Sequence, residues 1–360
     1  MKNINKASTH TRILSLLCAS ACLLSLFTLS SCSVFSRDEK FTAEYFDYFD
    51  TYSKITVYAD SEEDFERYES IARSTLEEYH RLFDIYHEYD GITNLATINS
   101  KAGRSWEEAD IKLIEAVQFG IDAYFETEGH TNIAMGSVIA LWNKAFDDFA
   151  KDGSATLPTR EELDTALRKS DINTIKINSA RTKIFIADQD TSINMGAVAK
   201  GYVADKLFDL LKAAGCRSFL IDLGGNIQSY GLKPDSSPWL GEIYDPTTKG
   251  SLTAEPFPLR NLTVVTSGAY QRYITVDGKD YCHILNVENG MPADTFASVS
   301  VIAVSGYSAL ADALSTALFT MSFEDGFELV ESFADVEAVW IYPDGTVRES
   351  ENFRVMTSQK

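Results

Sequence analysis

The sequence predicts one large α+β domain, in which helices and strands are mixed along the chain between residues 46 and 360. Two features of this region support the prediction. Apolar residues recur with the 3.6-residue period of helices in some segments and alternate with the two-residue period of strands in others. The region contains no internal repeat and no Gly-, Pro- or Ser-rich linker that would divide it. A chain of 360 residues can bury a large core, so one domain is expected.

Helical periodicity is clearest in the N-terminal half of the chain. Apolar residues at helical spacing predict a long helix over 62–83 and another over 111–125, the latter stopped by Gly129. Leu95 and Ile98 lie between them and predict a short helix. Further helices are expected over 160–169, 198–211, 309–321 and 325–333.

Strands are expected where β-branched and aromatic residues alternate or form short apolar runs. These segments are 53–58, 183–187, 218–223, 262–265, 273–276, 298–304, 339–342 and 346–348. Turn residues separate several of them, including the hairpin signal Pro343-Asp344-Gly345. The segments 147–159 and 232–255 are rich in polar residues, Gly and Pro, so we expect them to be irregular and to lie at the surface.

Residues 1–32 have the pattern of a secretory signal. Three basic residues precede an apolar run over 13–29, and the run ends in Leu29-Ser30-Ser31-Cys32. This ending resembles a bacterial lipobox, in which Cys32 carries the lipid and becomes the new N-terminus. The alternative is an N-terminal transmembrane anchor, although the run is short for a span. We therefore expect a lipoprotein signal peptide over 1–32, a tether over 33–45, and a lipid anchor on the extracytoplasmic side of the cell membrane.

The chain is strongly acidic, with a formal net charge of −21 at pH 7. Loss of the signal would lower the charge to −24, because the first 32 residues contain three basic residues and no acidic ones. Such a charge argues against binding nucleic acid and against attraction to anionic lipid. A polyanionic ligand would therefore need a local cationic group, such as a metal ion. Cys216 and Cys282 would be the cysteines left, which is no disulfide framework for a domain of this size.

The stretch SINMGAVAKGYVAD, residues 192–205, predicts a buried strand that turns at Gly196 into the helix over 198–211. Unpaired N–H groups at such a helix start, together with the helix dipole, favour an anion such as phosphate. Lys200 adds a mobile cation, and Gly201 allows close approach. The pattern by itself is that of an ordinary strand–turn–helix unit, so the rest of the chain must decide between the two interpretations.

Asp312 and Thr316 are four residues apart in the helix predicted over 309–321 and therefore share one face. Their oxygens are hard donors that suit Mg²⁺, which takes phosphate oxygens as further ligands. The alternative is an Asp that caps neighbouring groups and a Thr bonded to its own helix. His283 is a second candidate because it follows a predicted strand, although a lone His is usually structural. The fingerprints of phosphate-binding loops, zinc sites and serine hydrolases are absent from the sequence.

Six motifs occur in an order and at a spacing that resemble those of a known family. They are the lipobox, 193–205, 222–225, Thr266-Ser267-Gly268, 281–292 and 311–316. Together they resemble the ApbE-type FAD:protein FMN transferases over nearly the whole mature chain. The resemblance implies a single ApbE-type, T-fold-like domain with an FAD cleft. It also implies an enzyme that transfers the FMN part of FAD to a Ser or Thr hydroxyl of a client protein and releases AMP.

The resemblance assigns roles to residues of this sequence. Asp312, Thr316 and the backbone oxygen of Ala197 would hold Mg²⁺ against the FAD pyrophosphate, and His283 would assist the transfer. Contacts with FAD itself would come from a larger set of residues: Phe49, Tyr86, His130, Thr131, Asn132, Asn194, Lys200 and Ile284. The clients would be membrane redox subunits or FMN-binding domains.

The sequence departs from the family pattern in three places. Many members carry Asp where this chain has Asn132 and Asn194, and His-Ile-[IV]-Asp-Pro where it has His283-Ile284-Leu285-Asn286-Val287. An Asn side chain can still hydrogen-bond the edge of a nucleotide or a flavin. It has no negative charge, which argues against a role as a base or a metal ligand at these positions.

As a base, His283 would take the proton of the client hydroxyl. With the ordinary imidazole pKa of about 6.5, the transfer rate would fall below that pH. Two other functions fit part of the sequence: a non-catalytic lipoprotein that stores or delivers FAD, and a solute-binding lipoprotein of a transporter. The first would not need a metal on the pyrophosphate, and the second would have two similar lobes and bind no flavin.

Overall fold

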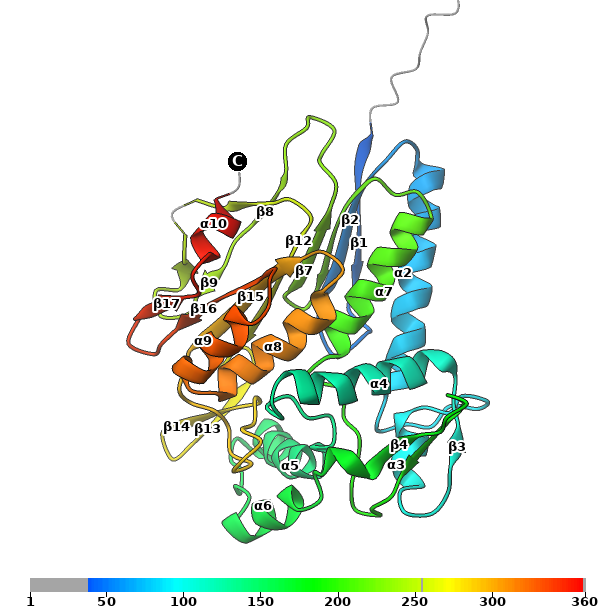
Figure 1. Cartoon of the computed structure of the whole chain (residues 1–360), viewed down its shortest axis with the longest axis vertical. Coiled ribbons are helices and arrows are strands. Elements are labelled where there is room, and N and C mark those ends of the chain that lie inside the picture. Colours follow the sequence, from blue (N-terminus) through cyan, green and yellow to red (C-terminus); the bar gives the residue numbers. More distant parts are fainter. Residues whose placement is uncertain (1–37, 254, 359–360) are drawn as a thin grey trace, which may run out of the picture.

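The computed structural model describes residues 38–253 and 255–358. Their centre is an antiparallel sheet of eight strands in the order β1-β2-β6-β7-β12-β15-β16-β17 (Figure 1). These strands are β1 (Glu39–Tyr45), β2 (Ser53–Ala59), β6 (Ser218–Leu223), β7 (Asn226–Tyr230), β12 (Leu262–Gly268), β15 (Ser298–Val304), β16 (Val336–Ile341) and β17 (Val347–Glu349). The mixed α+β class is confirmed. The signal peptide and lipobox predicted over 1–32 lie outside the described residues.

Four helices cover one face of this sheet (Figure 1): α2 (Glu62–Phe83), α7 (Ala199–Ala213), α8 (Ser308–Thr320) and α9 (Phe323–Glu331). Successive strand residues point to opposite faces, so Val301 packs against the α8–α9 layer while Ile302 packs on the other side. That other face is covered by the strand pair β8 (Trp239–Gly241) and β11 (Phe257–Leu259) and by α10 (Phe353–Thr357). The short strands β9 (Tyr244–Asp245) and β10 (Gly250–Ser251) form another pair.

The packing of α7 against α8 depends on Gly201. A Cβ at this position would lie 2.3 Å from the backbone oxygen of Ser308 and 2.7 Å from Cβ of Asp312, closer than real contacts allow. The two helices are also joined by Asp205 of α7, whose carboxylate accepts hydrogen bonds from the Ser308 and Ala309 amides at 2.9 and 2.8 Å. Asp205 thus caps the start of α8 and fixes the helix that carries Asp312.

A second layer of helices and short strands lies below the sheet in Figure 1. Its helices are α3 (Leu95–Ser100), α4 (Ile111–Glu126), α5 (Gly136–Asp152), α6 (Arg160–Leu167) and the 3₁₀ turn η1 (Ile172–Thr174). Its strands are the sheet β3 (Glu107–Glu108), β5 (Lys183–Ile186) and β4 (Ile175–Ile177), and the hairpin β13 (Tyr273–Val276) and β14 (Lys279–Cys282). None of the helices in the described ranges is long and apolar enough to span a membrane.

The structure corrects four local predictions. Residues 39–45, predicted as part of the tether, form β1, which pairs with β2 and stacks Phe41 on Phe65. Helix α5 continues to Asp152 and ends at Gly153 with φ 69°, so the loop predicted over 147–159 starts later. The strand predicted at 193–195 is absent, because the chain there makes a single bridge between Met135 and Ser192. The segment 232–255, predicted to be irregular, contains β8, β9 and β10.

Candidate active site

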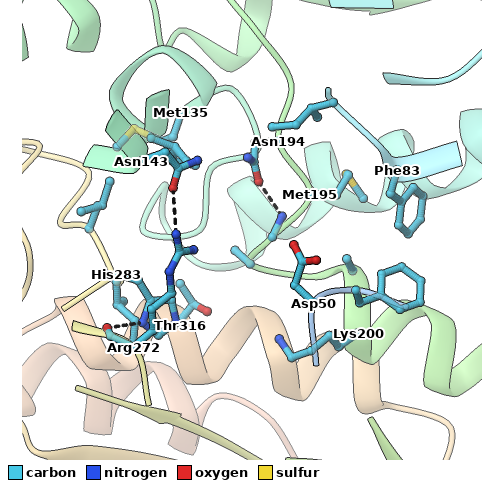
Figure 2. A pocket seen from close by; sticks show the side chains of 18 of the residues that line it. Asp50, Phe83, Met135, Asn143, Asn194, Met195, Lys200, Arg272, His283 and Thr316 are labelled. Atoms are coloured by element: carbon cyan, nitrogen blue, oxygen red, sulfur yellow. Dashed lines mark hydrogen bonds between the residues drawn. The ribbon is translucent and has the colours of Figure 1, made fainter. Parts of the chain in front are cut away.

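A cleft of about 630 Å³ lies where α7 and α8 meet α5, the β12–β13 connection and the segments that follow α2 and β14. Its volume is in the range of ordinary small-molecule and cofactor sites. Figure 2 shows Lys200 and Thr316 on the lower side of this cleft, and Asn143 and Asn194 on the upper side. Most of the residues predicted for the site line the cleft: Phe49, Tyr86, His130, Asn132, Asn194, Ala197, Lys200, His283, Ile284, Asp312 and Thr316.

Asp312 is the buried carboxylate of the cleft, with 4% of its surface exposed. One of its oxygens accepts a hydrogen bond from the Gly201 amide at 2.9 Å, and the other lies 3.8 Å from Nζ of Lys200. Burial raises the pKa of the Asp312 carboxyl, while the Lys200 charge and the Gly201 N–H oppose that rise. A carboxylate in this position is stabilised by cations, and it has one oxygen that Lys200 reaches only at the long end of ion-pair distance.

Thr316 lies one helical turn after Asp312 and also faces the cleft. Its hydroxyl makes no side-chain hydrogen bond with any described residue, so it is not bonded back to its own helix. With the Ala197 carbonyl, the donor set is carboxylate, hydroxyl and backbone oxygen, which is the chemistry that Mg²⁺ prefers. The residues therefore fit Mg²⁺. Across 38–253 and 255–358, no cluster of three or more His, Cys, Asp or Glu is placed to hold a metal.

The N-terminus of α7 does not form the open anion site, which was one of the two interpretations of residues 192–205. The amides of Val198 and Ala199 bond to the backbone oxygen of Met195, and the Gly201 amide bonds to Asp312. These N–H groups are therefore not available to a phosphate. The cationic contribution of this region comes instead from Lys200, whose side chain reaches the cleft from the first turn of α7.

His283 follows β14 and is held by the backbone of Arg272. Its amide donates to the Arg272 oxygen at 3.1 Å, and Nδ1 lies 3.2 Å from the same oxygen. Because a carbonyl can only accept, Nδ1 carries the proton of the neutral ring, and Nε2 keeps its lone pair. The ring is reachable from solvent on the cleft wall, yet the surrounding protein removes much of its hydration. This burial, assisted by the Lys200 and Arg272 charges, lowers the pKa of His283 from 6.5 to about 4.

Arg272 and Asn143 are cleft residues that the sequence analysis did not identify. The Arg272 guanidinium lies 3.5 Å from Oδ1 of Asn143 and 4.7 Å from the centre of the Phe146 ring (Figure 2). Nδ2 of Asn143 donates to the Tyr86 hydroxyl at 3.1 Å. The sequence did contain a signal for Arg272. It is a basic residue directly before a predicted strand in a strongly acidic chain. We call Tyr86, Asn143, Arg272 and His283 the His283 wall, and Ala197, Lys200, Asp312 and Thr316 the α7–α8 wall.

The remaining predicted residues line the rest of the cleft, and they differ in how many of their polar groups are already hydrogen-bonded to the protein. Phe49 has a positive φ of 56°, and its amide donates to Nδ1 of His80 at 3.2 Å. Nδ1 of His130 lies 3.3 Å from the Thr320 hydroxyl. Both ends of the Asn132 amide are bonded to the protein, to the Ala134 amide and the Ser170 oxygen. Oδ1 of Asn194 accepts from the Gly196 amide at 2.8 Å.

Thr131 and Asn286 have structural positions instead. Thr131 is fully buried, donates to the Ala313 oxygen at 2.6 Å and does not line the cleft, so its predicted FAD contact is corrected. The reason is local: His130 and Asn132 face the cleft, and the residue between them points the other way. Asn286 accepts from the Glu288 and Asn289 amides and shapes the turn after His283.

The cleft brings together oxygen donors that suit a metal, the Lys200 ammonium and the His283 imidazole, a set that suits an anionic ligand such as a nucleotide. The chain belongs to the ApbE family, whose sequence profile matches residues 49–340. A relative from Treponema pallidum (strain Nichols), an FAD:protein FMN transferase, is 34% identical over 270 residues, which are 71% of this chain and 72% of the relative. Another of that name from Klebsiella pneumoniae (strain 342) is 25% identical over 268 residues, 72% and 81% of the two chains.

The ApbE protein of Thermotoga maritima has the same fold, with a TM-score of 0.78 and 24% identity over 89% of this chain and 100% of that one. The family resemblance inferred from the six motifs is therefore confirmed. The family also excludes the solute-binding lipoprotein, since the matched region contains most of the main sheet and the residues that line the cleft.

Proposed function

We propose that this protein is an FAD:protein FMN transferase. The observation that carries the proposal is the arrangement of a buried Asp312 carboxylate, the Lys200 ammonium and a neutral His283 imidazole around one cleft in a chain of the ApbE family. The names of the relatives at 34% and 25% identity support the same activity.

The α7–α8 wall would bind the pyrophosphate of FAD. Asp312, Thr316 and the Ala197 carbonyl would hold Mg²⁺ there, and the ion would neutralise charge on the phosphates. Lys200 would add a second positive charge from the first turn of α7. In a chain of net charge −21, these local cations are what admit a polyanion.

The His283 wall would receive the client. The Ser or Thr Oγ of the client attacks the phosphorus of the FMN half of FAD, so that a new P–O bond forms. The P–O bond to the AMP half breaks, and AMP leaves with its electron pair. The proton of the hydroxyl passes to Nε2 of His283, which holds a free lone pair because Nδ1 is bonded to Arg272. The step consumes FAD and a hydroxyl and needs no oxidant or reductant.

The lipobox supports a lipid anchor at Cys32 on the extracytoplasmic side of the membrane, with membrane redox subunits or FMN-binding domains as clients. Mass spectrometry of membrane-fraction protein is expected to find acyl chains on Cys32, and an unmodified Cys32 there would end this part of the proposal. We do not favour a carrier that only stores FAD, since storage needs neither a base such as His283 nor a metal on the pyrophosphate.

The direct test is to incubate the mature protein with FAD, Mg²⁺ and an FMN-binding domain of a membrane redox subunit. Flavin fluorescence in a denaturing gel should appear on the client and should require the metal. The same client with its acceptor hydroxyl removed is the control and should stay dark. FAD binding without any covalent flavin on a set of such domains would favour the carrier instead.

A further inference from the structure

A second cavity of about 360 Å³ adjoins the cleft along helix α5. Four residues line both spaces: Ile85, Tyr86, Ile139 and Asn143. The outer part is formed by one face of α5, through Gly136, Ala140, Lys144, Asp147 and Asp148. We call this second cavity the α5 hollow. It adjoins the cleft at these four residues, and Asp312 is not part of its lining.

A chain of contacts leads from the α5 hollow to His283. Tyr86 and Asn143 lie on the border between the two cavities and are hydrogen-bonded at 3.1 Å. Asn143 contacts the Arg272 guanidinium at 3.5 Å, and the Arg272 backbone oxygen holds Nδ1 of His283 at 3.2 Å (Figure 2). A molecule in the hollow therefore lies beside Tyr86 and Asn143, which begin this chain of contacts.

The lining of the α5 hollow does not suit the phosphates of a nucleotide. Its charged groups are Lys144, Asp147 and Asp148, and Lys144 is already paired with Asp148 at 2.7 Å. Asp147 has no ion-pair partner among the residues that the structure describes. The single cation in this lining is thus already paired, whereas the main cleft is lined by both Lys200 and Arg272.

The same lining suits an extended polypeptide. Ile85, Ile139 and Ala140 give an apolar floor for one aliphatic side chain, and carboxylates at the rim can accept hydrogen bonds from backbone N–H groups. We propose that the α5 hollow binds the segment of the client that carries the acceptor Ser or Thr, with an aliphatic side chain on the floor and the hydroxyl directed over the Tyr86–Asn143 border toward His283. This inference rests on the proposed transferase activity.

The test compares two tryptophan variants on the exposed face of α5. Ala140→Trp fills the hollow, whereas Ala150→Trp makes the same change on the same helix at an exposed position that lines neither cavity. The probe is an FMN-binding domain of a membrane redox subunit that the wild-type protein flavinylates. KM for this domain, kcat and the affinity for FAD are measured for all three proteins.

We expect Ala140→Trp to raise KM for the client about tenfold or more, because a filled apolar site excludes its side chain. FAD affinity and kcat at saturating client should match the wild type, and Ala150→Trp should match it throughout. Unchanged KM in Ala140→Trp would overturn the proposal. So would a matching loss of FAD affinity, which would assign the hollow to the flavin. Absence of transfer by the wild type itself, with every client domain, would overturn the proposed function and this inference with it.

Discussion

The two walls of the cleft are built in different ways. The α7–α8 wall belongs to two helices that Gly201 brings into close contact, and its carboxylate is 4% exposed. The His283 wall is made of residues on connections and on the outer face of α5, joined by hydrogen bonds of 3.1 to 3.5 Å. A closely packed wall keeps charges in fixed positions, whereas a loosely joined one can adjust. Under our proposal, the first holds one defined substrate and the second admits protein clients.

The largest effect is expected from Asp312→Asn, which breaks the α7–α8 wall without changing its shape. Asparagine can still accept the Gly201 N–H but carries no charge for a metal. We expect transfer to fall by about 10³-fold or more, because a metal supplies several kcal/mol of charge stabilisation. Thermal stability should hold or rise, since a desolvated carboxylate is removed. Wild-type transfer rates in this variant would show that the metal assignment is wrong.

His283→Ala tests the other wall, and a loss of about 10²–10⁴-fold in the transfer rate is expected for a missing general base. The pH dependence of the wild type sharpens the test. The base acts when it is neutral, and its pKa is lowered from 6.5 to about 4. The rate should therefore stay level from pH 7 down through pH 6.5 and decline only as the pH approaches about 4. A decline centred near 6.5 in the wild type, absent in the variant, would contradict the desolvated imidazole.

Gly201→Ala should separate the helices that carry the α7–α8 wall. The added Cβ meets the Ser308 oxygen at 2.3 Å, so the pair must move apart, and overpacking of this kind costs about 1–3 kcal/mol of unfolding free energy. Gly250→Ala is the matched control, because its nearest neighbour is at an ordinary 3.6 Å. Chemical denaturation compares the two variants. Equal stabilities would mean that the close approach of α7 and α8 does not constrain the site.

The smallest effect at neutral pH is expected from Asp205→Asn. Burial raises the pKa of Asp205 from 3.8 to about 6, so between these values the folded state keeps a proton that the unfolded state loses. Stability should fall by about 3 kcal/mol as the pH rises through this window from this group alone. Asparagine cannot titrate, and its single acceptor oxygen can keep one of the two amide hydrogen bonds at the start of α8. Denaturation between pH 4 and pH 7 should show a less negative slope in the variant, and identical slopes would contradict the assignment.

The helices and the chemistry of the α7–α8 wall were predictable because both depend on short-range patterns. The period of apolar residues gives α2 its bounds of Glu62–Phe83, and a spacing of four residues puts Asp312 and Thr316 on one face. The family motifs then added His283 and the flavin. Each of these signals lies within a few neighbouring residues.

The failures depend on contacts between distant segments. Strand β1 is polar along one side and gains its order from pairing with β2 and from the Phe41–Phe65 contact. The Gly201 amide in the first turn of α7 is taken by Asp312, which lies 111 residues further along the chain. The His283 pKa likewise depends on burial among several elements. No local pattern in the sequence contains these neighbours.

The most direct test of the separate roles of the two walls is a measurement of FAD affinity. Asp312→Asn and His283→Ala are titrated side by side with FAD, with and without Mg²⁺. Our proposal predicts that His283→Ala binds FAD like the wild type, with the same gain in affinity from the metal, because neither FAD nor the metal needs the imidazole. Asp312→Asn should lose that gain. If His283→Ala loses affinity as strongly as Asp312→Asn, or if Asp312→Asn keeps its response to Mg²⁺, the two walls do not have the separate roles assigned to them.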